Sequence, residues 1–567
     1  MKRYKLQSFL SLLMIVAVLT TSCSKKTVIQ PFSNSLFTTN PSPLELVGTK
    51  VPVTINGRFP AKWFDKEITA VVTPVLKYQG GEALGTPYTY QGEKVAGNGI
   101  VVNHDNGSAV TMRSEFNYIP AMKKSELYLR FDFSKKGKTI PGFGDLKIAD
   151  GVLATQSLAN AAYSTPSVAP DAFQRIIKET YDADIMFLIQ QAELRSSELN
   201  SNNLAAWKDL VKEADENQRK NVNVEVSAYA SPDGGFELNE KLAEKREKNT
   251  STYLSKEFRK ENIDTEINAR YTAQDWEGFQ KLVQASSLQD KDLVLRVLSM
   301  YPDSEARERE IKNISAVYSD LAETILPKLR RSRLIANVEV IGKTDQELKQ
   351  AAASDMSGLT VEELLYSANL DGVSKEKVYT YITQKYPNDY RGWNNLGAYY
   401  YQQRQTAKAA QAFNKAASIS SRAPEANMNQ ALLSLAEGNT AKAEQQLGGA
   451  SGASSLGEAM GLLYIQKGDY NRAVQAFGDT QSNNAAVAQI LVKNYNKAQQ
   501  ILNSLPQKDA TTYYLSAIVA ARTNNAAGVA GNLKSALDGG IPASELINDI
   551  EFARFLNNSD IRNMLFR

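Results

Sequence analysis

The sequence is poor in the side chains that build metal centres and nucleophilic catalytic sites. Its 567 residues include one cysteine, Cys23, and one histidine, His104. A zinc site needs about four ligands, and a histidine-based nucleophile system needs an imidazole, a nucleophile and an orienting acid together. The sequence also lacks a phosphate-binding P-loop and a G-x-S-x-G nucleophile motif. We therefore predict no catalytic residue, no metal and no cofactor, and we expect a protein that is not an enzyme.

No excess of charge of either sign is present. Lys and Arg number 65, and Asp and Glu number 62. A nearly neutral chain offers no strong field to attract a polyanion, so we do not expect nucleic-acid binding. The length is about three times that of an average domain, which favours several folded units.

Long apolar runs are also missing, except for a short one near the N-terminus. Residues 9–19 are mostly apolar and follow the basic residues Lys2, Arg3 and Lys5. A run of this length is too short to span a bilayer and is typical of an export signal. Small residues and then Cys23 follow it, which resembles a bacterial lipobox with Thr20 in the position where leucine is usual.

We predict that residues 1–22 are a lipoprotein signal peptide and that Cys23 is lipidated. An ordinary secretory signal is the alternative, but lipidation also explains a lone thiol in an exported chain. The residues after the cysteine include Lys25 and Lys26, whereas surface-exported lipoproteins of the Bacteroidetes, which this chain resembles, carry acidic residues there. We therefore expect an outer-membrane lipoprotein that faces the periplasm, attached through its acyl chains.

Composition then divides the first part of the mature chain in two. Residues 23–45 are rich in Ser, Thr, Asn and Pro, which favours a tether. Residues 46–160 contain β-rich runs at 51–55, 67–76, 109–118 and 125–133, and the last of these alternates apolar and polar side chains. We predict a small β-sandwich here, of unknown role, with His104 in a loop or at a strand end.

Residues 174–342 alternate strands and helices. Residues 183–189 and 222–226 read as strands, and 238–258 has helical periodicity. This order favours an α/β sandwich. A segment at about 269–330 intervenes before a last strand at 334–341. It ends on a basic run at 328–333, which is either a ligand for phosphate or carboxylate groups or a solvated face.

Two sequence stretches in this region, 224–231 (VEVSAYAS) and 239–246 (NEKLAEKR), resemble the OmpA-like peptidoglycan-binding family. The resemblance implies an aspartate and an arginine fifteen residues apart that together bind the diaminopimelate of the stem peptide. Arg246 matches the arginine, but Ser231 stands where the family has aspartate. Asp233 is near enough in sequence to replace that carboxylate, and Asn239 matches the asparagine ahead of the helix. Peptidoglycan binding and a retained fold without the ligand both stay open.

After a polar stretch at 343–358, predicted as a linker, residues 359–567 match the tetratricopeptide repeat pattern W-x2-L-G-x2-Y followed by A-x3-F. The first copy has all seven positions, and a later copy has four. These structural signature residues are Trp393, Leu396, Gly397, Tyr400, Ala409, Phe413 and Ala416, and then Gly461, Tyr464, Ala473 and Phe477. Successive copies are 34, 30, 25 and 31 residues apart, which predicts an irregular all-α solenoid with a groove for partner proteins.

The expected architecture is therefore multidomain: a β-sandwich, an OmpA-like α/β sandwich and a tetratricopeptide solenoid behind a lipid anchor. It predicts a scaffold that docks outer-membrane and periplasmic proteins through its repeats. Such a scaffold resembles the accessory lipoproteins of an outer-membrane assembly or secretion machine. The alternatives are a peptidoglycan-linked structural lipoprotein and, with less support, a glycan-acting enzyme whose chemistry lies within 46–160.

Overall fold

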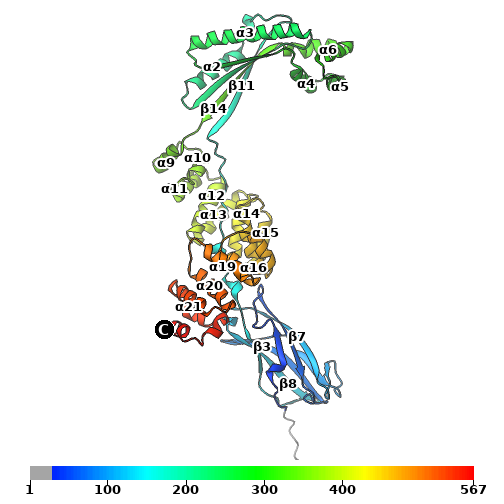
Figure 1. Ribbon diagram of the computed structural model, residues 1–567, viewed down its shortest axis with the longest axis vertical. Helices are drawn as coiled ribbons and strands as arrows, with labels where there is room; N and C mark the ends of the chain where they lie inside the picture. The colour runs from blue at the N-terminus through cyan, green and yellow to red at the C-terminus, as the bar shows by residue number, and fades with distance from the viewer. Residues whose placement is uncertain (1–28, 567) are drawn as a thin grey trace, which may run out of the picture. The chain divides into compact units, whose positions relative to one another are not determined.

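The computed structural model describes residues 29–566, so the expected signal peptide and Cys23 lie outside the described residues. The chain forms two compact units that are not consecutive in sequence (Figure 1). The first unit comprises the chain up to Pro170 together with Lys375–Arg567. The second unit comprises Asp171–Ser374. The first unit therefore joins the N-terminal strands to the C-terminal helices, although about 200 residues separate them in sequence.

Two β-sheets form the N-terminal part of the first unit. One sheet has the order β1-β2-β7, and the other has the order β10-β8-β3-β5-β6, with β4 paired to β3 and β9 paired to β8. The strands are β1 (Phe37–Asn40), β2 (Lys50–Phe59), β3 (Ile68–Tyr78), β4 (Gly81–Leu84), β5 (Tyr88–Gly92), β6 (Ile100–Val102), β7 (Ser108–Asn117), β8 (Ser125–Lys135), β9 (Lys138–Ile140) and β10 (Leu146–Gly151), with short 3-10 turns η1 (Asn34–Leu36) and η2 (Pro120–Lys123).

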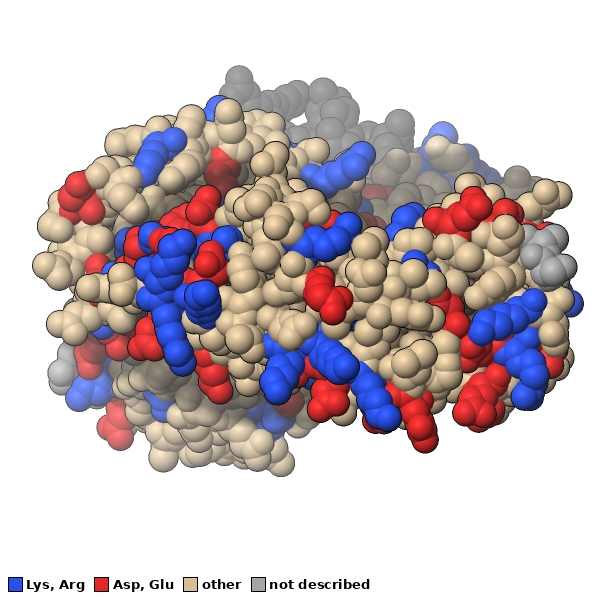
Figure 2. Space-filling view, turned by 90° about the horizontal axis from the view of Figure 1, so that it is seen from above, with Lys and Arg blue, Asp and Glu red and all other residues tan. Residues whose placement is uncertain are grey.

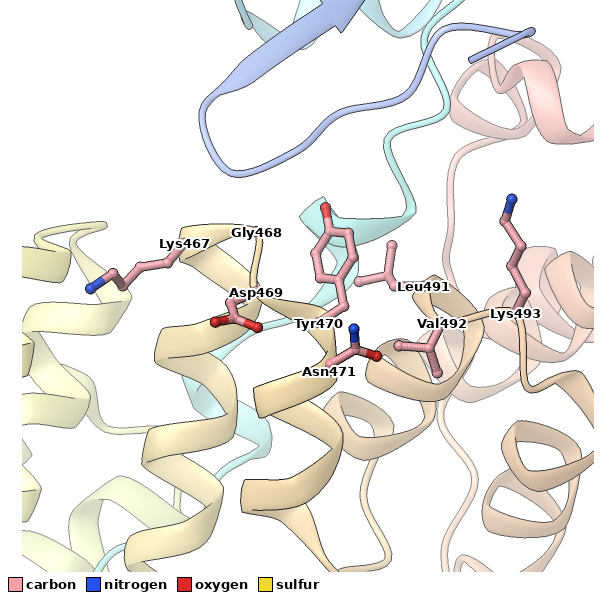
Figure 3. A pocket seen from close by; sticks show the side chains of 8 residues that line it. All are labelled: Lys467, Gly468, Asp469, Tyr470, Asn471, Leu491, Val492 and Lys493. Atoms are coloured by element: carbon pink, nitrogen blue, oxygen red, sulfur yellow. The ribbon is translucent and has the colours of Figure 1, made fainter. Parts of the chain in front are cut away.

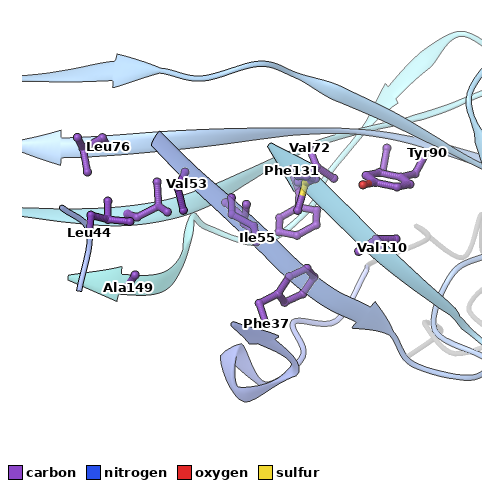
Figure 4. Packing of buried hydrophobic residues seen from close by; sticks show 14 of the residues in the cluster. Phe37, Leu44, Val53, Ile55, Val72, Leu76, Tyr90, Val110, Phe131 and Ala149 are labelled. Atoms are coloured by element: carbon purple, nitrogen blue, oxygen red, sulfur yellow. The ribbon is translucent and has the colours of Figure 1, made fainter. Parts of the chain in front are cut away.

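Both sheets contribute to one apolar core. β8 places Leu127, Leu129, Phe131 and Phe133 on its buried side, as its alternating sequence predicts. Side chains of β2 and β7 face them, and Figure 4 shows residues of both sheets packed together. The four β-rich runs of the sequence correspond to β2, β3, β7 and β8. Together the two sheets make a β-sandwich.

The expected tether at 23–45 is wrong for residues 34–45. Strand β1 pairs with β2 from Phe37 to Asn40, and the Leu44 side chain is fully buried in the core. Ser, Thr and Pro dominate the composition of this stretch, so its few buried apolar side chains are not evident from the composition. Those side chains are enough to add an edge strand to the sheet.

The second unit contains a four-stranded sheet of order β11-β14-β12-β13. β12 and β13 are parallel, and the other two pairs are antiparallel. Helices α2 and α3 pack on one face of the sheet, as Figure 1 shows, and their apolar side chains share its core. The elements are β11 (Ile176–Met186), α1 (Ser196–Leu199), α2 (Asn202–Glu216), β12 (Lys220–Tyr229), α3 (Phe236–Glu261), β13 (Ile267–Thr272) and β14 (Arg331–Ile341).

Between β13 and β14 the expected insertion forms a helical subdomain with its own apolar core. Its helices are α4 (Trp276–Ala285), α5 (Lys291–Met300), α6 (Ser304–Asn313), α7 (Ser315–Thr324) and α8 (Leu326–Leu329). The stretch expected as a linker contains helix α9 (Asp345–Ala353), and α10 (Val361–Ser367) follows in the same unit. The expected linker is therefore wrong for the residues of α9. The Thr344–Glu347 capping box starts this helix, and the side chain of Leu348 is buried.

Antiparallel helix pairs make up the rest of the first unit. The helices are α11 (Lys375–Lys385), α12 (Tyr390–Gln402), α13 (Thr406–Ile419), α14 (Pro424–Ala436), α15 (Thr440–Gly448), α16 (Leu456–Lys467), α17 (Tyr470–Phe477), α18 (Asn483–Leu491), α19 (Tyr495–Ser504), α20 (Ala510–Arg522) and α21 (Ala526–Asp538), ended by α22 (Ala543–Ile547), η5 (Ile550–Phe555) and α23 (Ser559–Leu565). None of the helices between residues 29 and 566 combines the length and the apolar character that a bilayer crossing requires.

Close approach of paired helices depends on glycine at the signature positions. In the first pair, a Cβ atom added to Gly397 would lie 2.5 Å from the Phe413 ring. In the third pair, a Cβ atom on Gly461 would lie 2.5 Å from the Phe477 ring. Phe413 and Phe477 are both buried, so each ring fills the space that its glycine leaves open. Gly397, Phe413, Gly461 and Phe477 are therefore core residues, whereas Trp393, Tyr400 and Tyr464 are half-buried.

We expect Gly397→Ala to lower the free energy of unfolding of the array by about 1–3 kcal/mol, since Phe413 must leave its position. Gly448→Ala is the matched control, because the added Cβ atom would meet nothing within 4 Å at the end of α15. The control should be neutral or raise stability by about 0.5–1 kcal/mol. Thermal unfolding followed by helical circular dichroism measures both, and equal midpoints for the two variants would contradict this account.

Candidate polypeptide-binding groove

The chain leaves the β-sandwich as a segment that runs along the inner helices of the repeat array. We call residues 155–170 the strap; it contains two short 3-10 turns, η3 (Thr155–Leu158) and η4 (Ala161–Tyr163), and is extended beyond them. Its first residue, Thr155, donates a hydrogen bond to Glu551 at the end of the array. Its penultimate residue, Ala169, bonds to Asn395 in the first full helix pair. Figure 1 shows the strap as a cyan trace among the yellow to red helices.

A side-chain carboxamide holds each of three strap residues by its main chain. Asn395 Oδ1 accepts the N–H of Ala169 at 2.7 Å, and Asn395 Nδ2 donates to the Ala169 carbonyl at 2.9 Å. A carboxamide carries one acceptor and two donors in a plane, so it satisfies both main-chain groups of one residue as a neighbouring β-strand would. The side chain of the bound residue takes no part in these two hydrogen bonds.

The same pairing occurs twice more. Asn429 accepts the N–H of Ser167 at 2.8 Å and donates to its carbonyl at 2.7 Å. Asn484 accepts the N–H of Asn160 at 2.9 Å and donates to its carbonyl at 2.8 Å. All three carboxamides belong to residues that are buried. Together they form a carboxamide ladder, defined as Asn395, Asn429 and Asn484.

The ladder residues occupy one position of the repeat. Asn395 and Asn429 are 34 residues apart, which is the first repeat spacing. The 55 residues between Asn429 and Asn484 equal the next two spacings, of 30 and 25 residues, with Ala459 at the intervening equivalent position. The ladder therefore follows the superhelix, and the strap runs antiparallel to the order of the repeats.

Further polar groups of the inner helices satisfy the strap between these points. The Tyr401 hydroxyl donates to the Ala161 carbonyl, and Arg404 donates to the Ala162 carbonyl, both at 2.6 Å. The carboxylate of Glu458 accepts the N–H of Thr165 at 2.9 Å. Each such bond contributes about 1 kcal/mol net, but leaving its buried partner unpaired costs about 1–3 kcal/mol.

The strap has small side chains at four buried positions, although Pro166 is also buried and Leu158 packs against the core of the array. Ala161, Ser164, Ser167 and Ala169 are at most 5% exposed, whereas Val168 between the last two is 39% exposed. The hydroxyl of Ser167 lies 2.9 Å from that of Ser454. Short side chains let the main chain approach within hydrogen-bonding distance of the ladder. The groove therefore selects for size at these positions rather than for chemical type.

Burial changes the proton affinity of groups along the groove. It raises the pKa of the Glu458 carboxyl, an effect that the bond from Thr165 partly offsets. It also raises the pKa of the Tyr401 phenol well above its ordinary value. Tyr401 therefore stays neutral and donates its proton to the strap at any physiological pH.

The start of the strap is also bonded to the sandwich. The carboxamide of Gln156 accepts the N–H of Gly48 at 2.9 Å and donates to its carbonyl at 2.8 Å. The Tyr470 hydroxyl lies 2.6 Å from Gln156 Oε1 and 2.9 Å from the Leu46 carbonyl. Figure 3 shows Tyr470 pointing from the helices toward this loop, beside an open depression lined by residues 467–471 and 491–493. Carboxamide pairing thus joins sandwich, strap and array.

A charged network strengthens the same junction. Lys123 of the sandwich donates to the Tyr514 hydroxyl at 2.8 Å and lies 3.3 Å from the Asp549 carboxylate. Tyr514 in turn donates to Asp549 at 2.5 Å. Burial raises the pKa of Tyr514 far above its ordinary value, and the charge of Asp549 adds to the effect. One lysine therefore neutralises a buried carboxylate that the array alone leaves uncompensated.

In the second unit, the expected peptidoglycan-binding arginine is fully buried. Arg246 donates to the main-chain carbonyls of Gln191, Tyr229 and Leu188, at 2.9, 2.8 and 3.2 Å. Its guanidinium also lies 4.9 Å from the centre of the Phe187 ring. Burial, with a contribution from nearby Arg330, lowers its pKa to about 10, so the group is still charged at neutral pH. These bonds fix the loop after β11 against α3.

The candidate replacement carboxylate already has a cationic partner. Asp233 accepts from Arg330 at 2.9 Å and from the Ser231 hydroxyl at 2.6 Å. Asn239 donates to the main-chain carbonyls of Ser231 and Gly234 and so shapes the turn ahead of α3. These four residues therefore lie near one another, and Arg330, from the end of the insertion, pairs with the Asp233 carboxylate.

The basic run at the end of the insertion is neutralised within the unit. Arg331 pairs with Asp275 at 3.2 Å, and Arg333 pairs with Asp182 at 2.7 Å. Figure 2 shows positive and negative side chains interleaved over the face it presents, in keeping with the overall balance of charge. A solvated face does not describe Arg330 and Arg331 either, because their side chains are 11% and 14% exposed and form ion pairs within the unit.

No cluster of three potential metal-ligating side chains occurs among residues 29–566. His104 Nδ1 lies 2.7 Å from the Phe64 carbonyl in a turn of the sandwich. Sequence reasoning missed the carboxamide ladder altogether. The signal was present, because asparagine recurs at the repeat spacing on the inner helices, but a repeat signature built on apolar positions does not record it.

Comparisons with known proteins find distant similarity to solved structures. No family model matches the chain, and no curated protein matches it in sequence. A tetratricopeptide repeat protein from Parabacteroides merdae is similar at 14% identity and a TM-score of 0.25, over 51% of this chain and 98% of that one.

Two further solved structures are similar to the same degree. The type IV pilus biogenesis factor PilW has 15% identity and a TM-score of 0.24, over 39% of this chain and 98% of its own. The APC/C Cut9–Hcn1 structure has 16% identity and a TM-score of 0.25, over 64% and 80%. The C-terminal part is an array of helix pairs at the spacing that the sequence predicts.

We expect Asn429→Ala to speed hydrogen exchange at the Ser167 amide about tenfold or more, because this N–H loses its acceptor. Asn414→Ala is the matched control. Asn414 is exposed on outer helix α13 and touches Gln430 rather than the strap. Mass-spectrometric exchange over residues 155–170 of the full chain is the measurement, and equal rates in the two variants would exclude the ladder as the clamp.

Proposed function

We propose that this protein is a lipid-anchored scaffold whose repeat array binds polypeptide segments of partner proteins. The carboxamide ladder supports this most directly. A row of buried carboxamides at repeat spacing, each aimed at the N–H and carbonyl of one residue, suits the recognition of extended polypeptide. In the present structure the bound segment is the chain's own strap, whereas the sequence analysis expected the groove to receive a partner.

The same proposal includes attachment through Cys23 to the outer membrane, with the folded units in the periplasm. The lipobox-like N-terminus and the basic residues that follow Cys23 support it. An anchored chain with a polypeptide-binding array and two further folded modules suits an accessory subunit of an outer-membrane assembly or secretion machine.

Site-specific photo-cross-linking tests the docking role. Photoreactive residues at Gln403 and Lys493, both exposed in the turns that follow inner helices α12 and α18, should cross-link full-length protein to a defined set of envelope proteins in its native membranes. Lys138, exposed on strand β9 of the sandwich, is the matched control position. Cross-links no stronger at the array than at Lys138 would count against docking through the repeats.

The anchor has its own control within that experiment. Cys23→Ala removes the only thiol of the chain, so the variant should leave the membrane pellet and appear in the soluble periplasmic fraction. If Cys23→Ala stays in the pellet, the acyl anchor is wrong, although the docking role is untouched by that result.

For the second unit, we propose a retained OmpA-like fold without the cell-wall ligand. Two contacts support this. Arg246 is fully buried and donates its hydrogen bonds to three main-chain carbonyls, and Asp233 is paired with Arg330. A zwitterionic amino acid needs one free anionic and one free cationic partner at the protein surface. Neither partner is free here, so a peptidoglycan-linked role is the less favoured alternative.

Calorimetric titration of the full chain with a diaminopimelate-containing muropeptide should therefore give no saturable heat at millimolar ligand. Arg330→Ala, which releases Asp233 from its partner, is the informative variant. Binding that appears only in Arg330→Ala would support occlusion by Arg330. Saturable binding by the unmodified chain, lost in Asp233→Asn, would restore the cell-wall role.

A further inference from the structure

We propose that the strap is a displaceable resident ligand of the groove, and that partner segments with an extended main chain and small side chains replace it. This inference rests on the proposed role of the array in binding polypeptide. It adds the class of segment that fits and the event that must precede binding. Without release of the strap, the inner face of the array is closed to partners.

The groove can accept another segment because it recognises the main chain. All six ladder bonds go to N–H and carbonyl groups of Asn160, Ser167 and Ala169. Tyr401 and Arg404 also donate to carbonyls. Any extended residue other than proline presents both of these groups. A second polypeptide in the same register would therefore restore every one of these main-chain bonds that the strap gives up.

Side-chain size sets the limits on the segment. The two clamped positions nearest the first helix pair carry Ser167 and Ala169, which are 0% and 2% exposed. A Cβ substituent larger than a hydroxyl there would push the main chain away from Asn429 and Asn395. Val168 points outward between them, so a large residue is tolerated at the middle position. The partner segment is thus small–any–small, with Ala, Ser or Gly at the clamped positions.

The strap competes by proximity rather than by exceptional contacts. It is covalently continuous with the sandwich before Thr155 and with the second unit after Pro170. A segment held at both ends rebinds as if present at a local concentration of roughly millimolar, so a free partner of equal affinity is excluded. Its buried side chains are mostly alanine and serine, which bury little apolar area. A pull on either tethered end therefore opens the groove.

A labelled peptide tests the proposal in the full-length chain. The probe is a fluorescein-labelled peptide with the sequence of residues 155–170, followed by fluorescence anisotropy. In the double variant Ser167→Trp, Ala169→Trp, two indoles cannot enter the clamped positions, so the strap is expelled and the array is unchanged. Val168→Trp is the matched control, because position 168 faces outward.

The expected result is saturable binding of the peptide to the double variant and at least tenfold weaker binding to the unmodified chain and to Val168→Trp. Adding Asn429→Ala to the double variant should weaken the binding about tenfold. Equal binding to the unmodified chain and the double variant would overturn the strap as competitor. No binding to a double variant that keeps its helical circular dichroism would overturn the groove as a site for segments in trans.

If the double variant does not fold, hydrogen exchange in the unmodified chain tests whether the strap is released. Amides of Ser167 and Ala169 that exchange well before the buried core of the sandwich support a releasable strap, whereas exchange only on global unfolding overturns it. Failure here is separable from failure of the docking role. Cross-links at Gln403 and Lys493 that persist without peptide binding would refute the strap proposal alone.

Discussion

Pairing of a side-chain carboxamide with the N–H and carbonyl of one residue is the interaction on which the first unit depends. Asn395, Asn429 and Asn484 use it to hold the strap, and Gln156 uses it to hold the sandwich loop at Gly48. Main-chain groups buried outside regular secondary structure need partners, and carboxamides supply two at once. A segment without its own sheet or helix thereby becomes an internal part of the fold.

This pairing explains why the N-terminal strands and the C-terminal helices form one unit. The strap begins at the sandwich and ends at the first helix pair, so every repeat that it crosses is tied to the same segment. Lys123, Tyr514 and Asp549 add a buried charge network at one end. The strap occupies the proposed recognition surface of the array and is also the segment that links the sandwich to the second unit. A partner that binds this surface must therefore displace the linking segment.

In the second unit, the residues that the sequence suggested for ligand binding are paired within the chain. Arg246 donates to three main-chain carbonyls and is a structural residue of the loop after β11. Arg330, at the end of the helical insertion, forms an ion pair with the Asp233 carboxylate. A cation supplied from within the chain costs less conformational entropy than one supplied by a ligand, because it is already tethered.

The sequence by itself determined the elements whose signal is local. Alternation predicted β8, apolar periodicity predicted α3, and the spacing of Gly397, Phe413 and their later counterparts predicted the helix pairs. Tertiary structure alone decided what depends on distant partners. It placed Phe37 and Leu44 in a sheet core despite a tether-like composition, paired Asp233 with Arg330 ninety-seven residues away, and put the strap in the groove. Hydrogen bonds from a carboxamide to a main chain leave no trace in the sequence of the segment that is held, since every residue carries the same main-chain groups.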